Sequence, residues 1–169
     1  LAAVLNDSKN KKIALYCGHG CQHAVKEVEQ LAETLKAPIV ASFRGKIFFD
    51  RPDSPYIAGM NGLLGHSSGY DACAKADVLL MLGTDFPYAE FLPKKSTIIQ
   101  IDERPDIIGR RAKVDYGFAG DIKDSITALL PKLSTRTDDG FLKDIHKEYL
   151  ELEKSLDDYT QKKSKEKQI

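Results

Sequence analysis

The chain has 169 residues, of which 42% are hydrophobic, which is enough for one substantial core and too few for two ordinary catalytic domains. Basic and acidic residues are equal at 25 each, so the net charge gives no reason to expect nucleic acid as a partner. The cysteines, Cys17, Cys21 and Cys73, lack a repeated short spacing, which argues against a secreted disulfide framework. An apolar run of roughly 18 residues, as in a membrane-spanning helix, is not found, and we expect a cytoplasmic protein.

The first part of the chain predicts alternating strands and helices. An apolar run at 12–17 stops at a glycine turn and is followed by apolar residues at helical spacing over 24–35. The next apolar run, 38–43, comes soon after, which is the strand–helix–strand rhythm of a parallel sheet covered on both faces. The stretch 44–64 is rich in proline and glycine and predicts a long irregular connection that binds a ligand.

The second part of the chain continues this rhythm. A short helix is expected at 67–76, followed by an almost unbroken apolar strand at 77–83 that suits burial on both faces. Further strands are expected at 96–102 and, most weakly, at 113–119, and Asp121 is the expected N-cap of the next helix. We therefore predict an α/β fold with a doubly wound, mostly parallel six-stranded sheet, helices on both faces and Rossmann-like topology.

The two ends of the chain predict that it is one piece of a longer protein. It starts at Leu1, without a methionine, in a segment with helical character. Near the other end, apolar residues again repeat at helical spacing: Phe141, Ile145, Leu152, Leu156 and Tyr159. We expect a binding domain at 1–135 and a linker helix at 136–169 that leads to a further domain, with a frayed, solvated lysine-rich end at 161–168 rather than a binding patch.

The glycine turn after the first strand is a candidate phosphate site. Ligands of open α/β sheets bind at the carboxyl ends of the strands, and glycine lets backbone amides approach a phosphate closely. Gly18 and Gly20 match the first two positions of the dinucleotide fingerprint, but His23 occupies the third. The usual dinucleotide grip is therefore not supported, and a glycine turn without a ligand is the alternative.

Two more strand ends carry candidate binding groups. Residues 83–88 follow the most buried strand and combine a hydroxyl, a carboxylate and two aromatic rings, which is a suitable cradle for a flat ring. Asp102 ends its strand as a lone carboxylate that could accept hydrogen bonds from ribose hydroxyls. A helix cap or an ion pair with Arg104 is the alternative role for Asp102, and capping alone would explain Asp121.

Two other kinds of site are weighed and disfavoured. Cysteine and histidine alternate over residues 17–23, but these side chains span a strand end and a helix start and would point in different directions, which argues against zinc. Residues 65–69 fit the G-x-S-x-G pattern of a serine hydrolase with Ser67 as nucleophile. That pattern needs a strand immediately before it, so a helix start capped by Ser67 or Ser68 is preferred and a hydrolase is the alternative of another class.

Several segments in combination resemble the middle domain of pyruvate oxidases. The similar segments are 59–70, 76–77, 82–88 and 98–102, and 44–46 and 120–122 fall in the same order as in that family. The resemblance extends from Lys12 to Leu133 and is nearest to the quinone-dependent pyruvate dehydrogenase branch. It departs at His19 and His66, where relatives are expected to carry smaller or apolar residues.

The resemblance implies an enzyme built from an amino-terminal pyrimidine-binding domain, this FAD-carrying middle domain and a carboxyl-terminal diphosphate-binding domain. Thiamine diphosphate and Mg²⁺ would be bound by the outer domains, pyruvate would be oxidatively decarboxylated, and electrons would pass through FAD to quinone or oxygen. The parent enzyme would be a cytoplasmic homotetramer, with a peripheral association with the membrane, and the isolated chain would not catalyse the reaction. The middle domain of an acetolactate-synthase-like enzyme is the alternative within this family.

Carried over to this sequence, the resemblance implies roles for individual residues. Residues 61–64 and 84–88 would line the flavin, Arg44 would neutralise pyrophosphate, Asp102 would hold the adenosine ribose, and Asp121 with Ile122 would flank the adenine. No catalytic or metal-binding residue is expected. The full predicted cofactor set is Gly18, Gly20, Arg44, Asn61, Gly62, Leu63, Leu64, Gly83, Thr84, Asp85, Phe86, Pro87, Tyr88, Asp102, Asp121 and Ile122.

Overall fold

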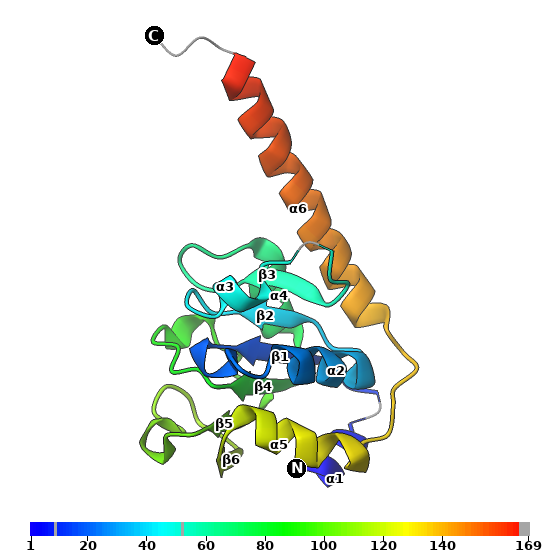
Figure 1. Cartoon of the computed structure of the whole chain (residues 1–169), viewed down its shortest axis with the longest axis vertical. Helices are drawn as coiled ribbons and strands as arrows, with labels where there is room; N and C mark the ends of the chain where they lie inside the picture. Colours follow the sequence, from blue (N-terminus) through cyan, green and yellow to red (C-terminus); the bar gives the residue numbers. More distant parts are fainter. Residues whose placement is uncertain (9, 52, 166–169) are drawn as a thin grey trace.

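A computed structural model of the chain describes residues 1–8, 10–51 and 53–165 (Figure 1). It forms one parallel six-stranded sheet in the order β3-β2-β1-β4-β5-β6, which is the doubly wound, Rossmann-like arrangement predicted from the sequence. The strands are β1 Ile13–Cys17, β2 Ile39–Ala41, β3 Ile57–Met60, β4 Val78–Leu82, β5 Thr97–Asp102 and β6 Tyr116–Ala119. The strand order reverses between β1 and β4, so the connections leave in opposite directions from this point.

Helices cover both faces of this sheet. Their bounds are α1 Ala2–Asn6, η1 His19–Cys21, α2 Val25–Leu35, α3 Lys46–Phe49, α4 Ser67–Lys75, η2 Ala89–Phe91, η3 Pro105–Ile107, α5 Ile122–Leu129, η4 Leu130–Lys132 and α6 Gly140–Lys165. Alternate residues of β1 face opposite cores, with Leu15 packed in the α2 and α5 layer and Tyr16 in the α4 and α6 layer. Every residue of β1 and β4 is buried, which explains why these strands are apolar along their whole length.

The helix starts expected from the sequence are found, but one of the expected caps is wrong. The Asp121 side chain accepts a hydrogen bond from the Asp124 amide at 2.9 Å, which confirms it as the N-cap of α5. Helix α4 begins at Ser67, with His66 rather than a serine at the cap position. The Ser68 hydroxyl instead donates to the Ala58 carbonyl at 2.8 Å, because it is buried against β3.

The stretch 44–64 differs from the irregular connection that its composition predicts. It contains the short helix α3 and the edge strand β3, which pairs with β2 through a register shift between Ile39 and Ala41. Gly59, inside β3, has a φ of +84°, and the strand is only four residues long. A short strand with an interior glycine has a weak sequence signal, and pairing with β2 decides its conformation.

Helix α6 packs on the body of the domain through its first turns only. Leu142, Ile145 and Tyr149 are buried, whereas Tyr159 is 58% exposed and the helix extends away from the sheet (Figure 1). The helix continues to Lys165, so the frayed end expected from residue 161 is wrong up to that point, since glutamine and lysine are good helix formers. Residues 166–169 lie outside the described part of the chain, and the division at residue 135 stays a prediction.

Among residues 1–8, 10–51 and 53–165, no helix combines the length and the apolar composition of a membrane-spanning segment.

Substitution of Ile145 by alanine tests whether the start of α6 belongs to the cooperative fold. The side chain is 2% exposed, so its truncation should lower the free energy of unfolding in urea by about 2–5 kcal/mol. Leu150, on the same helix, is 44% exposed, and Leu150→Ala should change that free energy by no more than about 0.5 kcal/mol. Equal effects of the two substitutions would show that α6 is not part of the core.

Candidate functional site

A cleft of about 1020 Å³ opens at the carboxyl edge of the sheet, next to the point where the strand order reverses. This is where open α/β sheets bind their ligands. Most of the predicted cofactor set is brought together there: Gly20, Arg44, Asn61, Gly62, Leu63, Leu64, Gly83, Thr84, Asp85, Phe86, Pro87, Tyr88, Asp102, Asp121 and Ile122. Gly18 is the predicted residue that does not line the cleft.

The two glycine turns after β1 and β4 pack directly against each other. A Cβ on Gly18 would lie 2.2 Å from the Gly83 carbonyl oxygen, and a Cβ on Gly83 would lie 2.6 Å from the Gly20 Cα. The Gly18 amide donates to the Leu82 carbonyl at 2.9 Å, and the Gly20 amide donates to the Gly83 carbonyl at 3.0 Å. The expected role of these amides as phosphate donors is therefore corrected, because both are used to join the two turns.

The 61–65 loop forms one wall of the cleft. Asn61 is buried, its side-chain amide donates to the Phe91 carbonyl at 3.1 Å, and its Oδ1 accepts from the Gly62 amide at 2.8 Å. Gly62 has a φ of +118°, and a Cβ there would lie 3.1 Å from the Phe86 ring. Leu63 and Leu64 are 68% and 73% exposed. The loop thus holds large apolar side chains at the cleft, while the buried Asn61 side chain has protein partners for both its amide nitrogen and its oxygen.

Phe86 anchors an aromatic cluster behind the same wall. Its ring lies edge-to-face with Tyr16, Tyr88 and Phe91, with centroid separations of 5.1, 5.5 and 6.3 Å. Tyr16 is completely buried in β1, so the cluster is fixed to the centre of the sheet. Together with Leu63 and Leu64, this aromatic cluster forms the apolar wall of the cleft.

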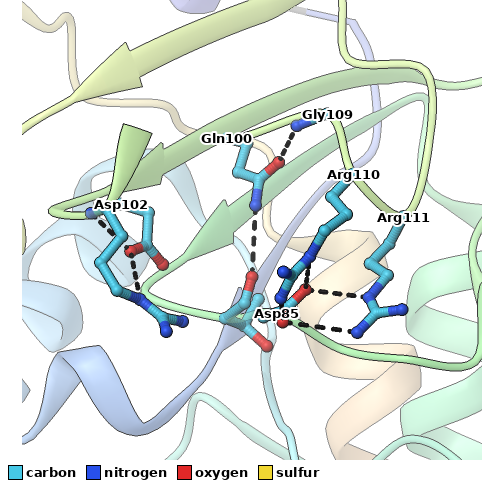
Figure 2. Close-up of polar contacts among 8 residues, drawn as sticks. Asp85, Gln100, Asp102, Gly109, Arg110 and Arg111 are labelled. Atoms are coloured by element: carbon cyan, nitrogen blue, oxygen red, sulfur yellow. Dashed lines mark hydrogen bonds and ion pairs between the residues drawn. The ribbon is translucent and has the colours of Figure 1, made fainter. Parts of the chain in front are cut away.

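The 83–88 turn, which lines the cleft, is also held by a polar network that sequence reasoning missed (Figure 2). Arg110 and Arg111 both pair with Asp85, the latter through its Nε at 2.9 Å. Burial would raise the pKa of Asp85, but hydrogen bonds from Arg110 and Arg111 outweigh it, so the pKa lies below its ordinary value. Asp85 lines the cleft, as expected from the sequence, and its carboxylate is paired with these two arginines.

Gln100 is the second part of this network (Figure 2). Its Nε2 donates to the Thr84 carbonyl at 3.2 Å, and its Oε1 accepts from the Gly109 amide at 2.9 Å. The side chain is buried within an apolar strand, and a buried amide needs partners. That isolated polar residue in the run 96–102 is the signal by which the sequence could have indicated the network. Gln100 therefore fastens the loop after β5 to the turn after β4.

The two carboxylate oxygens of Asp102 differ in their surroundings. It is 4% exposed, and its Oδ1 accepts from the Arg104 amide at 3.0 Å and lies 3.8 Å from the Arg104 Nε. Burial raises the pKa of Asp102, against the opposing effect of the Arg104 hydrogen bond. Among the described residues no group bonds Oδ2. The alternative role as a partner of Arg104 is confirmed, and one oxygen stays available to a ligand.

The positive charge at the cleft comes from Arg44 and Arg104. Both side chains are exposed, and Arg44 forms no ion pair with any carboxylate of residues 1–8, 10–51 or 53–165. A guanidinium without a protein partner suits an anionic group such as a phosphate. The cleft can therefore hold an elongated ligand with a flat apolar part, an anionic middle and hydroxyl groups.

The zinc and hydrolase alternatives find little support in the described part of the chain. No group of three His, Cys, Asp or Glu side chains there could hold a metal ion, and the three cysteines are buried and free. Ser67 is exposed, but a loop separates it from the end of β3, so it does not occupy a strand-to-helix elbow. A serine hydrolase also needs a histidine beside the serine. His146 is the histidine that follows Ser67 in the sequence, and its Nδ1 is 2.9 Å from the Ile57 carbonyl.

Substitution of Gln100 by leucine should loosen the contact between the loop after β5 and the 83–88 turn. It leaves the Gly109 amide and the Thr84 carbonyl without their partner, so we expect a loss of about 1–3 kcal/mol in urea unfolding and faster amide exchange at Gly109. Gln100→Glu keeps an acceptor for Gly109 and should preserve the slow exchange of that amide. Wild-type stability in Gln100→Leu would contradict the role given to this bridge.

Comparison with known proteins identifies the central domain of thiamine pyrophosphate enzymes. The family model "Thiamine pyrophosphate enzyme, central domain" matches residues 1–129. An "Uncharacterized 42.6 kDa protein in isoamylase 3'region" of Pseudomonas amyloderamosa is 49% identical over 94% of this chain and 39% of its own length. Pyruvate oxidase of Lactiplantibacillus plantarum is 35% identical over 72% of this chain and 21% of its own length.

Other similar proteins carry different activities in their names. Sulfoacetaldehyde acetyltransferase of Roseovarius nubinhibens is 33% identical over 82% of this chain and 24% of its own length. An X-ray structure from Mycobacterium smegmatis, described as a thiamin diphosphate-dependent enzyme, superposes with a TM-score of 0.63 at 25% identity over 81% of this chain and 27% of that chain. The chain spans about two-fifths or less of the length of these relatives. It belongs to the family of thiamine pyrophosphate enzyme central domains.

Proposed function

We propose that this chain is the FAD-binding central domain of a thiamine-diphosphate-dependent enzyme of the pyruvate oxidase type. The observation that carries the proposal is the cleft in which an apolar wall, the Asp102 carboxylate and Arg44, which pairs with no carboxylate of the described residues, meet. In this proposal the chain binds and orients FAD, while thiamine diphosphate and Mg²⁺ are held by other parts of the parent enzyme. When bound, FAD supplies an acceptor for the electrons released by pyruvate decarboxylation.

The residues of the cleft fit the parts of FAD. Leu63, Leu64 and the Phe86 cluster offer an apolar surface suited to the flavin ring. Arg44 would neutralise the pyrophosphate, and the free Oδ2 of Asp102 would accept from a ribose hydroxyl. Since both of these groups lack a competing protein partner at the atoms concerned, binding would not require an existing ion pair to break.

The position of the remaining groups supports the same orientation. Asp121 and Ile122 line the cleft at the start of α5, where they would flank the adenine. The loop that carries Arg110 and Arg111 is tied to the 83–88 turn through Asp85, so this turn is held in place before a ligand arrives. A preformed pocket lowers the entropy lost on binding.

A second candidate is the middle domain of a non-oxidative enzyme of the same family. Sulfoacetaldehyde acetyltransferase matches a larger share of this chain than pyruvate oxidase does, at similar identity. A "Probable acetolactate synthase large subunit" of Methanocaldococcus jannaschii is 31% identical over 65% of the chain. Pyruvate reduces the flavin only if the parent enzyme is an oxidase, so bleaching of flavin absorbance by pyruvate separates the two candidates. In either case we propose a homotetrameric, cytoplasmic parent, with quinone or oxygen as acceptor for the oxidase and a peripheral association of that oxidase with the membrane.

Titration of the chain with FAD, followed by flavin fluorescence, tests the site directly. Wild type should bind FAD more tightly than ADP, because only FAD covers the apolar wall. Asp102→Ala should weaken FAD binding about tenfold or more, as expected for a lost hydrogen bond to a charged group. Glu103→Ala, at the neighbouring exposed position of the same cleft, should bind like wild type. Equal affinity for FAD and ADP would refute the flavin part of the proposal.

Arg44 is tested by comparing ligands with and without phosphate. Arg44→Ala should weaken FAD about tenfold and leave riboflavin nearly unaffected, because riboflavin has no pyrophosphate. Arg44→Lys should recover only part of the affinity, since lysine does not form the bidentate contact. Calorimetry with both ligands measures this, and an equal loss for riboflavin would place Arg44 at the ring instead.

A further inference from the structure

His66 closes the base of the 61–65 loop, which lines the cleft. The His66 amide donates to the Met60 carbonyl at 2.7 Å, and the Met60 amide donates to His66 Nδ1 at 3.1 Å. The space for this ring depends on Gly59, because a Cβ there would lie 2.3 Å from Nδ1. The same side chain therefore fixes where the loop leaves β3 and where it enters α4.

The hydrogen bond from Met60 determines what the other ring nitrogen can do. Nδ1 accepts, so it carries no hydrogen, and in the neutral ring the hydrogen is on Nε2. Nε2 lies 3.9 Å from Oε1 of Glu153, a residue of α6. A shift of about 1 Å brings this donor and acceptor to hydrogen-bond distance. His66 is thus directed at the loop with one nitrogen and at α6 with the other.

The face of α6 that meets His66 is also the face that holds the helix on the domain. The rings of His66 and Tyr149 lie 5.9 Å apart, and Tyr149 is 1% exposed. Burial, followed by the charges of Glu153 and Asp50, raises the pKa of Tyr149 to about 12, so the phenol stays neutral at physiological pH. One turn earlier, His146 Nδ1 is 2.9 Å from the Ile57 carbonyl of β3.

We infer that His66 is a positioning residue that couples the cleft-lining loop to the docking of α6, so that a ligand in the cleft and a seated α6 stabilise each other. Any movement of the loop base displaces the His66 ring, which changes its contacts with Glu153 and Tyr149. Such coupling is reciprocal, so displacement of α6 would weaken ligand binding by the same factor. The inference rests on the proposed function for the identity of the ligand, FAD, but not for the contact itself.

Three substitutions of His66 separate the roles of its two ring nitrogens. His66→Asn places an oxygen near the position of Nδ1 and is too short to reach Glu153, whereas His66→Gln reaches toward Glu153 without a matched acceptor for Met60. His66→Phe keeps the ring against Tyr149 and removes both polar contacts. Amide hydrogen exchange over residues 145–153, with and without FAD, measures the docking of α6, and fluorescence titration measures FAD affinity.

In wild type we expect FAD to slow exchange in this part of α6 by about fivefold or more, a typical coupling. His66→Asn should bind FAD almost like wild type and lose this response, whereas His66→Gln should bind FAD more weakly and retain part of it. His66→Phe should show both losses. An α6 that does not respond to FAD in wild type, or that responds equally in His66→Asn, overturns the inference.

A measurement without ligand keeps the coupling separate from the proposed function. Glu153→Ala should speed amide exchange at Met60 and across the 61–65 loop about fivefold or more. Glu151→Ala removes the same type of side chain from an exposed position on α6 and should leave the loop unchanged. Equal exchange in the two variants overturns the coupling. If wild type binds neither FAD nor ADP, the proposed function fails, and this comparison still decides the coupling.

Discussion

The close packing of the glycine turns that follow β1 and β4 is the constraint on which the cleft depends. Gly18, Gly20 and Gly83 allow backbone to meet backbone at separations that a side chain would prevent. The chain therefore turns sharply at the point where the strand order reverses, and residues 84–88 are directed into the opening rather than across it. Glycine acts here through contact between protein segments, and its amides are consumed in that contact.

Different forces hold two parts of the cleft lining. Aromatic packing connects Phe86 to the buried Tyr16 of the central strand. Gln100 and the pair of arginines on Asp85 fasten the loop after β5 to the 83–88 turn. A ligand in the cleft would meet groups that protein contacts already hold in place, which lowers the entropy lost on binding.

Helix α6 is only partly packed on the domain. Its first turns are part of the core, and its later turns project from the body with exposed apolar residues such as Leu156 (Figure 1). His66 lies between this helix and the loop that lines the cleft. A loop and a helix that share one side chain have a direct physical route for coupling.

The sequence alone determined the parts of the structure that depend on local pattern. The apolar runs of β1, β4 and β5, the helical spacing of α2 and the cap formed by Asp121 follow from periodicity and residue type. The predicted set also contains 15 of the 23 residues that line the cleft, although ligand binding by them stays a prediction.

Tertiary structure alone decided the features whose partners are distant in the chain. Strand β3 exists through pairing with β2, and Gly18 is withdrawn from the cleft by contact with Gly83. Asp85 is neutralised by arginines 25 and 26 positions away, and His66 meets Glu153 only because α6 returns across β3 and α4. A sequence pattern records the burial and conformation of a residue, but the groups that it contacts across the fold are fixed only when the elements pack together.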